Sequence, residues 1–136
     1  MRRSRRSRGS SLKPSKAANK ERGDIGEEAA AGYLSGRGYR IAERKFRCRS
    51  GEIDIIAFDG HTLVFVEVRS RSGTDHGLPV ETIGREKRRR IIRTATAFQL
   101  RHGFFDADCR FDCVSVLFDG QGKVTDIELI KDAFWS

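Results

Sequence analysis

Two consecutive apolar segments, joined by an Asp-Gly pair, limit most strongly what this chain can fold into. The first covers residues 51–58 and the second residues 61–69, and both are rich in Val, Ile, Leu and Phe. Such segments on either side of an Asp-Gly pair predict a β-hairpin, because this dipeptide suits a two-residue turn. Charged residues inside them require an explanation, since a buried charge is costly unless it is paired. Four are present: Glu52, Asp54, Glu67 and Arg69.

The register of this hairpin decides which side chains meet. If Asp59 and Gly60 form the loop, Phe58 pairs with His61, and successive side chains alternate between the two faces of the sheet. One predicted face is uniformly apolar and should pack against a helix: Ile53, Ile55, Ala57, Val64, Val66 and Val68. The opposite face carries the charges and one aromatic ring: Glu52, Asp54, Phe65, Glu67 and Arg69. The three acids are therefore expected to converge.

Converging carboxylates indicate a site for a divalent cation. In the predicted register Glu52 lies directly opposite Glu67, about 4.5–5.5 Å away at Cβ, and like charges so placed destabilise a sheet. Mg²⁺ (or Mn²⁺) would remove this repulsion, because such a cation binds one or two carboxylates together with water and substrate phosphate. It could polarise a phosphodiester and activate a water molecule for in-line attack. A solvated sheet face with ordinary charges is the structural alternative.

A helix is predicted from residue 25 to residues 36–38, with Asp24 as its N-cap. Glu27 shares one face of this helix with small and apolar residues at positions 30, 31 and 34. Glu27 is therefore a candidate metal ligand that approaches the hairpin from the helix. Its structural alternative is a first-turn charge that complements the helix dipole.

A second, arginine-rich helix is predicted from Val80 to Leu100, after a mobile loop at residues 70–79. Its inner stripe would consist of Ile83, Lys87, Ile91, Ala95 and Phe98. Lys87 on this stripe is either a lysine whose amine reaches solvent or a cation that reaches the acids or a phosphate. The basic residues expected to contact a nucleic-acid backbone are Lys87, Arg88, Arg89, Arg90 and Arg93.

Further strands at residues 39–48, 111–118 and 124–130 complete the order α-β-β-β-α-β-β. Helices that separate groups of strands predict an α/β fold, in which a mixed central sheet is flanked by helices. Residues 23–136 are expected to form one domain. Residues 1–22 hold nine Arg or Lys and one acid, and this segment is predicted to be a disordered basic tail.

The net charge of +8 lies entirely in this tail, because the remaining chain is formally neutral. The tail could add phosphate contacts, bind an acidic protein partner or only solubilise the chain. Three cysteines without a Cys-x-x-Cys pattern argue against a zinc site, and Cys109 and Cys113 are expected to be small buried hydrophobes. Without an apolar run of membrane length or a secretory signal, the expected location is cytoplasmic, with no membrane partner. The oligomeric state stays open, a homodimer included.

Together, these segments resemble the YraN family of small bacterial proteins over about residues 23–134. The matching residues are Gly26-Glu27, Gly38-Tyr39, Gly51 to Ala57, Leu63 to Val68, Lys87, Phe111-Asp112 and Asp132 to Phe134. That family is assigned to the restriction-endonuclease-like PD-(D/E)xK superfamily and looks similar to archaeal Holliday-junction resolvases. The resemblance implies a restriction-endonuclease-like αβββαβ core. It also implies Asp54 and Glu67 as the metal-binding acids, with Glu27 as a helical acid.

One residue departs from the superfamily pattern. The pattern ends in Glu-x-Lys, whereas this chain has Glu67-Val68-Arg69. An arginine stays charged, so it can stabilise the charge of a transition state but cannot serve as a base. Arg69 would then support slower hydrolysis or none, and Lys87 is a candidate substitute for the missing lysine.

We therefore expect a nucleic-acid-binding protein with a nuclease fold. Its expected activity is that of a Mg²⁺-dependent phosphodiesterase, an endonuclease that acts on branched or structured DNA. Asp54, Glu67 and Arg69 would be catalytic, and Glu27 and Glu52 would support the metal ion. The alternative is a non-catalytic module that binds nucleic acid and keeps the fold without efficient cleavage.

Overall fold

The computed structural model describes residues 16–72 and 83–134, which form one sheet and two helices. In chain order the elements are α1 (Lys16–Gly36), β1 (Arg40–Cys48), β2 (Gly51–Asp59), β3 (Thr62–Ser72), α2 (Arg85–His102), β4 (Cys109–Phe118) and β5 (Val124–Ile130). The strand order is β1-β2-β3-β4-β5, and neighbours are antiparallel except for the parallel pair β3 and β4. The predicted α/β fold, with an αβββαβ core and a mixed sheet, is confirmed.

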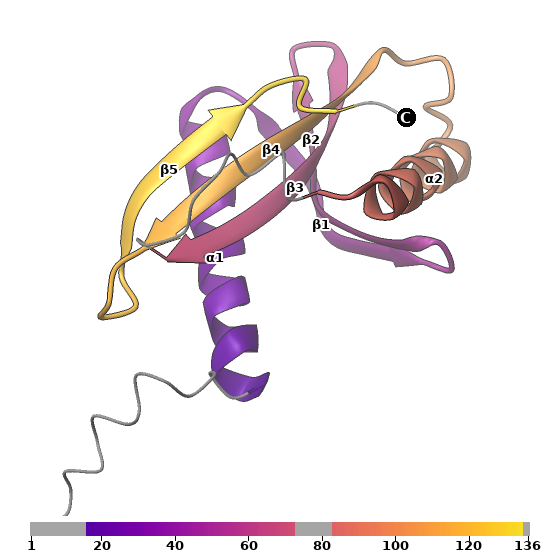
Figure 1. The fold of residues 1–136 in the computed structure, drawn as a ribbon. Helices are drawn as coiled ribbons and strands as arrows, with labels where there is room; N and C mark the ends of the chain where they lie inside the picture. The colour runs from indigo at the N-terminus through magenta and orange to yellow at the C-terminus, as the bar shows by residue number, and fades with distance from the viewer. Residues whose placement is uncertain (1–15, 73–82, 135–136) are drawn as a thin grey trace, which may run out of the picture.

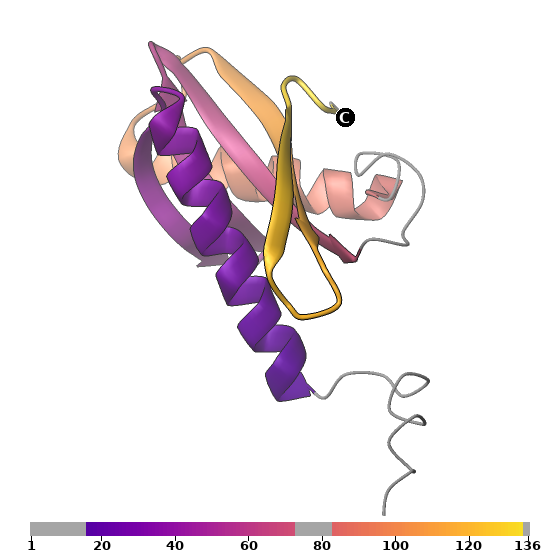
Figure 2. The ribbon, with the colours of Figure 1, turned by 90° about the vertical axis from the view of Figure 1, so that its left-hand side faces the viewer.

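The two helices cover opposite faces of the sheet, as Figure 1 and Figure 2 show. Beneath α1 lies a core that includes Leu34 together with Val64 and Val66 of β3. Beneath α2 lies a second core, which includes Phe98 of the helix and Phe65 of β3. Because both faces of β3 are covered, its first half is a nearly continuous apolar run. The parallel step from β3 to β4 requires a crossover connection, and α2 lies within it.

The first helix is longer than predicted. It begins at Lys16 rather than after Asp24, so residues 16–22 of the predicted disordered tail belong to α1. Composition explains the difference, because Lys, Ala, Glu and Arg are strong helix formers even without a capping residue. Figure 1 shows this end of α1 extending beyond the sheet. Residues 1–15, the rest of the predicted tail, lie outside the described residues.

The second helix begins at Arg85, five residues later than predicted. It ends at His102, because Gly103 adopts the left-handed conformation, with φ of 75°, that stops a helix. Ile83, predicted as the first residue of the inner stripe, thus precedes the helix but is still buried in the core beneath α2.

The third strand is longer than its predicted run and continues to Ser72. The first three residues of the predicted loop at 70–79 therefore belong to β3. The rest of that loop falls within residues 73–82, outside the described part of the chain.

The predicted hairpin is present, but its register is different. Asp59 pairs with Thr62, so the two-residue loop is Gly60-His61 rather than Asp59-Gly60. Gly60 has φ of 63°, as the first loop position of a type II′ turn requires. Asp59 stays in the strand, where its Oδ2 lies 2.9 Å from Nη2 of Arg110. The predicted pairs of Phe58 and Ile56 are therefore wrong by two positions along β3, a shift that leaves the faces of β3 unchanged. The predicted pairs of Asp54 and Glu52 do not form.

The alternation of faces breaks down at Asp54. Ile55 and Ala57 share a face that packs against a helix, as predicted, and this helix is α1. Ile53, predicted on the same face, lies instead in the core beneath α2. The pairing of β2 with β3 also ends at Ile55, immediately after Asp54. The two strands therefore separate at this residue, and the Asp54 side chain occupies the point of separation.

A buried carboxylate near the hairpin loop holds the C-terminal segment. Asp112 on β4 has no exposed surface and accepts a hydrogen bond from the Tyr39 hydroxyl at 3.0 Å. Its two oxygens also accept from Nε and Nη2 of Arg110, at 2.9 and 3.0 Å. The backbone N–H of Asp132 donates to the same group at 2.9 Å. Asp112 thus links the start of β1, β4 and the segment after β5.

Cys113 is buried in the core beneath α2, whereas Cys109 is only half buried. The expectation of buried cysteines is therefore confirmed for Cys113 alone. Neither helix of the described chain combines the length and the apolar composition needed to cross a membrane.

Candidate functional site

The candidate site is built around Asp54, where β2 and β3 separate. Oδ2 of Asp54 accepts a hydrogen bond from the backbone N–H of Val68 at 2.8 Å. Burial and the neighbouring Glu67 carboxylate raise the pKa of Asp54 to about 7. The surroundings of Asp54 therefore favour its neutralisation, either by a proton or by a cation.

The second acid of the site, Glu67 on β3, is buried and has cationic neighbours. Its side chain is 6% exposed, and its Oε2 lies 2.7 Å from Nζ of Lys87 on α2. Nη1 of Arg69, two residues further along β3, lies 3.7 Å from the same oxygen. The structure thus brings four predicted site residues together: Asp54, Glu67, Arg69 and Lys87.

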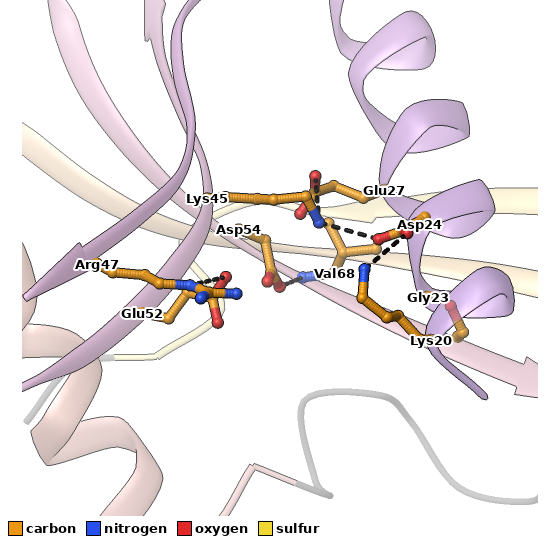
Figure 3. A pocket seen from close by; sticks show the side chains of 10 residues that line it. Lys20, Gly23, Asp24, Glu27, Lys45, Arg47, Glu52, Asp54 and Val68 are labelled. Atoms are coloured by element: carbon orange, nitrogen blue, oxygen red, sulfur yellow. Dashed lines mark hydrogen bonds and ion pairs between the residues drawn. The ribbon is translucent and has the colours of Figure 1, made fainter. Parts of the chain in front are cut away.

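Two hollows in the surface meet at Asp54. The first, of about 280 Å³, lies beside α1 (Figure 3). The second, of about 230 Å³, lies beside α2. Glu52 and Asp54 line both hollows, so these two acids stand at the boundary between them. The first hollow is also lined by Glu27, Lys45, Arg47 and Ser70, and the second by Gly51, Glu67, Lys87 and Arg90.

The helical acid Glu27 is buried, but its neighbours are cations rather than the other acids. Its Oε1 lies 3.0 Å from Nη2 of Arg44 and 3.3 Å from Nζ of Lys45, both on β1. Glu52 also has a cation as its neighbour, because its Oε2 lies 3.3 Å from Nε of Arg47. The three acids that were expected to converge, Glu52, Asp54 and Glu67, all line the hollow beside α2. The described residues nevertheless contain no group of three Asp, Glu, His or Cys side chains placed to hold a metal ion.

Gly26 allows α1 to bring Glu27 to the site. A Cβ at position 26 would collide with the hydroxyl of Ser70 on β3. Because glycine has no side chain, the helix can lie directly on the strand at this point. In the Gly26-Glu27 pair, the glycine therefore allows the close contact of α1 with β3, and the next residue is the buried acid.

Lys45 belongs to the candidate site, although no sequence pattern predicts it there. It lies inside β1 but has a φ of 56°, the left-handed conformation. This conformation costs a residue with a side chain about 1–2 kcal/mol, and such strain is typical of functional sites. Its amine lies 3.0 Å from Oδ1 of Asp24 and 3.3 Å from Oε1 of Glu27, as Figure 3 shows. No residue pattern in the segment marks Lys45, because both its partners lie on α1.

The backbone strain at Lys45 can be measured with a pair of variants. Lys45→Gly and Lys45→Ala lose the same ion pairs, so their difference reports the backbone alone. We expect Lys45→Gly to be more stable than Lys45→Ala by about 1 kcal/mol in urea denaturation, because only glycine adopts this φ without strain. The same two substitutions at Glu128, an exposed position of β5, should show the opposite order of stability, with the Ala variant more stable than the Gly variant. An Ala variant at position 45 as stable as the Gly variant would contradict the strain.

The predicted basic residues of α2 do not all face the site. Lys87 and Arg90 line the second hollow, and the side chains of Arg89, Arg90 and Arg93 are exposed. Arg88 instead donates from Nε to the carbonyl oxygen of Ile83 at 2.9 Å, with its guanidinium over the ring of Phe134. Arg88 therefore contributes to holding the C-terminal segment against α2.

The donors of this site suit a hard divalent cation. Asp54 and Glu67 offer carboxylate oxygens, and the two hollows beside them leave room for water and a phosphate group. Mg²⁺ is commonly held by one or two carboxylates, with waters and substrate phosphates completing its coordination. The residues present therefore fit this ion, although the third acid of the hollow, Glu52, pairs with Arg47 instead.

The fold and the site together define a class of protein. A five-stranded mixed sheet with one helix on each face is compatible with a restriction-endonuclease-like core. Within this class, the sequence model of the family described as "Uncharacterised protein family UPF0102" matches residues 26–116. The chain belongs to this family, which is the YraN family that its motifs resemble.

Curated relatives match most of the chain. A UPF0102 protein of Moorella thermoacetica is 47% identical over 115 residues, which cover 85% of this chain and 96% of the relative. A UPF0102 protein of Clostridium kluyveri is 44% identical over 116 residues, or 85% of this chain and 95% of the relative. One from Prosthecochloris aestuarii is 47% identical over 118 residues, or 84% and 93%.

Proposed function

We propose that this protein is a metal-dependent endonuclease that cleaves branched or structured DNA. The observation that carries the proposal is the pair of acids, Asp54 and Glu67, at the hollow beside α2, which Lys87 and Arg90 also line. A buried acid with a raised pKa, such as Asp54, is typical of a catalytic site when it lies in a cleft beside charged groups. A phosphodiester carries the negative charge that such cations would attract.

Each residue of the site has a role in this proposal. Asp54 and Glu67 would hold Mg²⁺ or Mn²⁺, and the hydrogen bond from the N–H of Val68 orients the Asp54 carboxylate. When bound, the metal ion would supply polarisation of the phosphodiester and an activated water. Arg69 and Lys87 would hold the phosphate at which cleavage occurs, because both cations lie beside Glu67.

The exposed face of α2 would bind the rest of the nucleic acid. Arg89, Arg90 and Arg93 are exposed on this helix, and arginine binds phosphate oxygens through two parallel hydrogen bonds. Phosphate contacts fix the position of a protein on DNA without reading its sequence. The proposal therefore predicts binding that weakens with salt and a preference for DNA structure over sequence.

A non-catalytic nucleic-acid-binding module is the second candidate. It is favoured by Arg69, which stands where the superfamily pattern has lysine and cannot act as a base. In this case the acids would keep the hairpin in place, and α2 would still bind phosphate.

One experiment separates the two candidates. The purified full-length protein is incubated with a four-way DNA junction, single-stranded DNA or duplex DNA, in Mg²⁺, Mn²⁺ or EDTA. Cleavage of the junction in metal ions but not in EDTA supports the endonuclease. Binding without cleavage, also in Arg69→Lys, supports the module, and the lack of both binding and cleavage contradicts both. Deleting residues 1–15, which precede α1, tests whether the basic tail adds affinity.

A further inference from the structure

We propose that Lys87 is a displaceable counter-ion of Glu67, which couples the binding of nucleic acid to the binding of the metal ion. In the free protein the ammonium group of Lys87 would form an ion pair with the carboxylate of Glu67. Phosphate of the nucleic acid would draw that group away and free Glu67 for a divalent cation. This inference rests on the proposed function, because it takes Asp54 and Glu67 as the residues that hold the metal ion.

The ion pair between Lys87 and Glu67 is short and asymmetric. Nζ of Lys87 lies 2.7 Å from Oε2 of Glu67, within hydrogen-bond distance. The Glu67 side chain is 6% exposed, whereas the Lys87 side chain is 43% exposed. The carboxylate is therefore fixed in the protein, while the ammonium group can move into solvent on its long aliphatic stem. Lys87 is the partner that can leave.

The charges around Glu67 make Lys87 a competitor of any metal ion. Arg69 contributes a second positive charge, at 3.7 Å from the same oxygen. A divalent cation that approaches Glu67 from the α2 side would find the carboxylate oxygen that it needs as a ligand already bound by the Lys87 ammonium group. Asp54 remains as the other ligand, so the first contact of the ion can be made there before Lys87 moves.

The hollow beside α2 offers Lys87 a second partner. Lys87 and Arg90, which are separated by three positions on α2, both line this hollow of about 230 Å³. Residues with this spacing lie on the same side of a helix. A phosphate group in the hollow would form an ion pair with the Lys87 ammonium group when that group leaves Glu67. Because linkage is reciprocal, nucleic acid would strengthen metal binding, and metal would strengthen nucleic-acid binding by the same factor.

The alternative is that Lys87 only orients Glu67. In that case Glu67 would be less well placed without Lys87, and metal binding would weaken or stay the same. The two ideas therefore predict opposite effects of removing the charge, and the sign of the effect decides between them.

The first measurement is Mn²⁺ affinity of the full-length protein without DNA, by titration calorimetry. We expect Lys87→Met to bind Mn²⁺ about fivefold tighter than the wild type, the lower end of typical coupling between sites. Lys87→Arg keeps the charge and should stay within about twofold. Lys123→Met, which removes an exposed lysine of the β4–β5 turn, is the matched control and should not change the affinity. If Lys87→Met does not fold, Lys87→Gln removes the same charge.

The second measurement is the affinity for a fluorescent four-way DNA junction with cleavage-resistant phosphorothioate linkages, with and without Mn²⁺. We expect Mn²⁺ to increase the affinity of the wild type and of Lys123→Met about fivefold, and that of Lys87→Met less than twofold. Unchanged or weaker Mn²⁺ binding by Lys87→Met, or coupling equal to that of the wild type, would overturn the inference.

Asp54→Asn distinguishes this failure from failure of the proposed function. If Asp54→Asn lowers Mn²⁺ affinity but Lys87→Met does not raise it, only the role of Lys87 is wrong. If Asp54→Asn binds Mn²⁺ like the wild type, or the wild type does not bind it, the metal site and the inference fall together.

Discussion

Replacing Asp54 by asparagine is expected to reduce metal-dependent DNA cleavage about a hundredfold or more. Asparagine keeps the shape of the side chain and can still accept the hydrogen bond from the N–H of Val68. It removes the negative charge, however, and so weakens the hold on the metal ion. A metal ion contributes several kcal/mol of transition-state stabilisation, and a loss of about 2.7 kcal/mol of it lowers the rate a hundredfold. DNA binding should be retained, because the exposed arginines of α2 are unchanged. Single-turnover cleavage and fluorescence anisotropy on the same junction measure the two effects.

The same variant should be more stable than the wild type at high pH. The pKa of Asp54 is raised in the folded protein, to about 7 from an ordinary 3.8, so the folded state binds its proton more tightly than the unfolded chain. Ionisation therefore lowers stability as pH rises from about 4 to about 7. Asparagine cannot ionise, and its gain relative to the wild type should be about 2–3 kcal/mol larger at pH 8 than at pH 5 in urea denaturation with EDTA.

Loss of cleavage together with a gain in stability would separate Asp54 from a residue that only supports the fold. Asp126→Asn, at an exposed position of β5, is the control and should change neither quantity. Cleavage by Asp54→Asn within tenfold of the wild-type rate would show that the reaction does not depend on this carboxylate.

Replacing Asp112 by alanine is expected to destabilise the protein by about 3–5 kcal/mol, the typical cost of removing one partner from a buried ion pair. The substitution leaves Arg110 without its two-oxygen acceptor and the O–H of Tyr39 without the oxygen that accepts its hydrogen bond. It also releases the backbone N–H of Asp132, which holds the C-terminal segment. Urea denaturation at pH 7 measures the loss.

Asp126→Ala is the matched control, since it removes an exposed carboxylate with the same change of side chain. Its effect should be within about 0.5 kcal/mol, as for most surface substitutions. A loss below about 1 kcal/mol in Asp112→Ala would mean that the network around Asp112 contributes little to the fold. In the folded variant, metal binding at Asp54 should be retained, because Asp112 does not line either hollow beside that residue.

Several parts of this protein could be read from local chemistry. The apolar runs at residues 51–58 and 61–69 predict strands because the preference for strand and turn is set by neighbouring residues. Asp54 and Glu67 could be selected as site residues for a related reason, since a charge inside an apolar run is visible before the chain folds. The order of helices and strands followed in the same way and is confirmed by the structure.

The errors arose where distant residues compete with a local preference. The Asp-Gly pair predicts Asp59 in the hairpin loop, but Asp59 lies in the strand. There it accepts a hydrogen bond from Arg110, which is 51 positions further along the chain. Alternation predicts Ile53 on the same face as Ile55 and Ala57, but β2 separates from β3 at Asp54 and Ile53 packs in the core beneath α2. Neither effect leaves a trace in the residues next to it.

Sequence therefore predicted the acids of the candidate site, while tertiary structure decided which charges surround them. The ion pairs of Glu67 with Lys87 and of Glu27 with Lys45 each join a strand to a helix. Such contacts depend on how the two helices lie on the sheet, and no local pattern encodes the distance between them. The physical reason is that burial raises the cost of an unpaired charge, so the folded chain, rather than the neighbouring sequence, selects the partner of each acid.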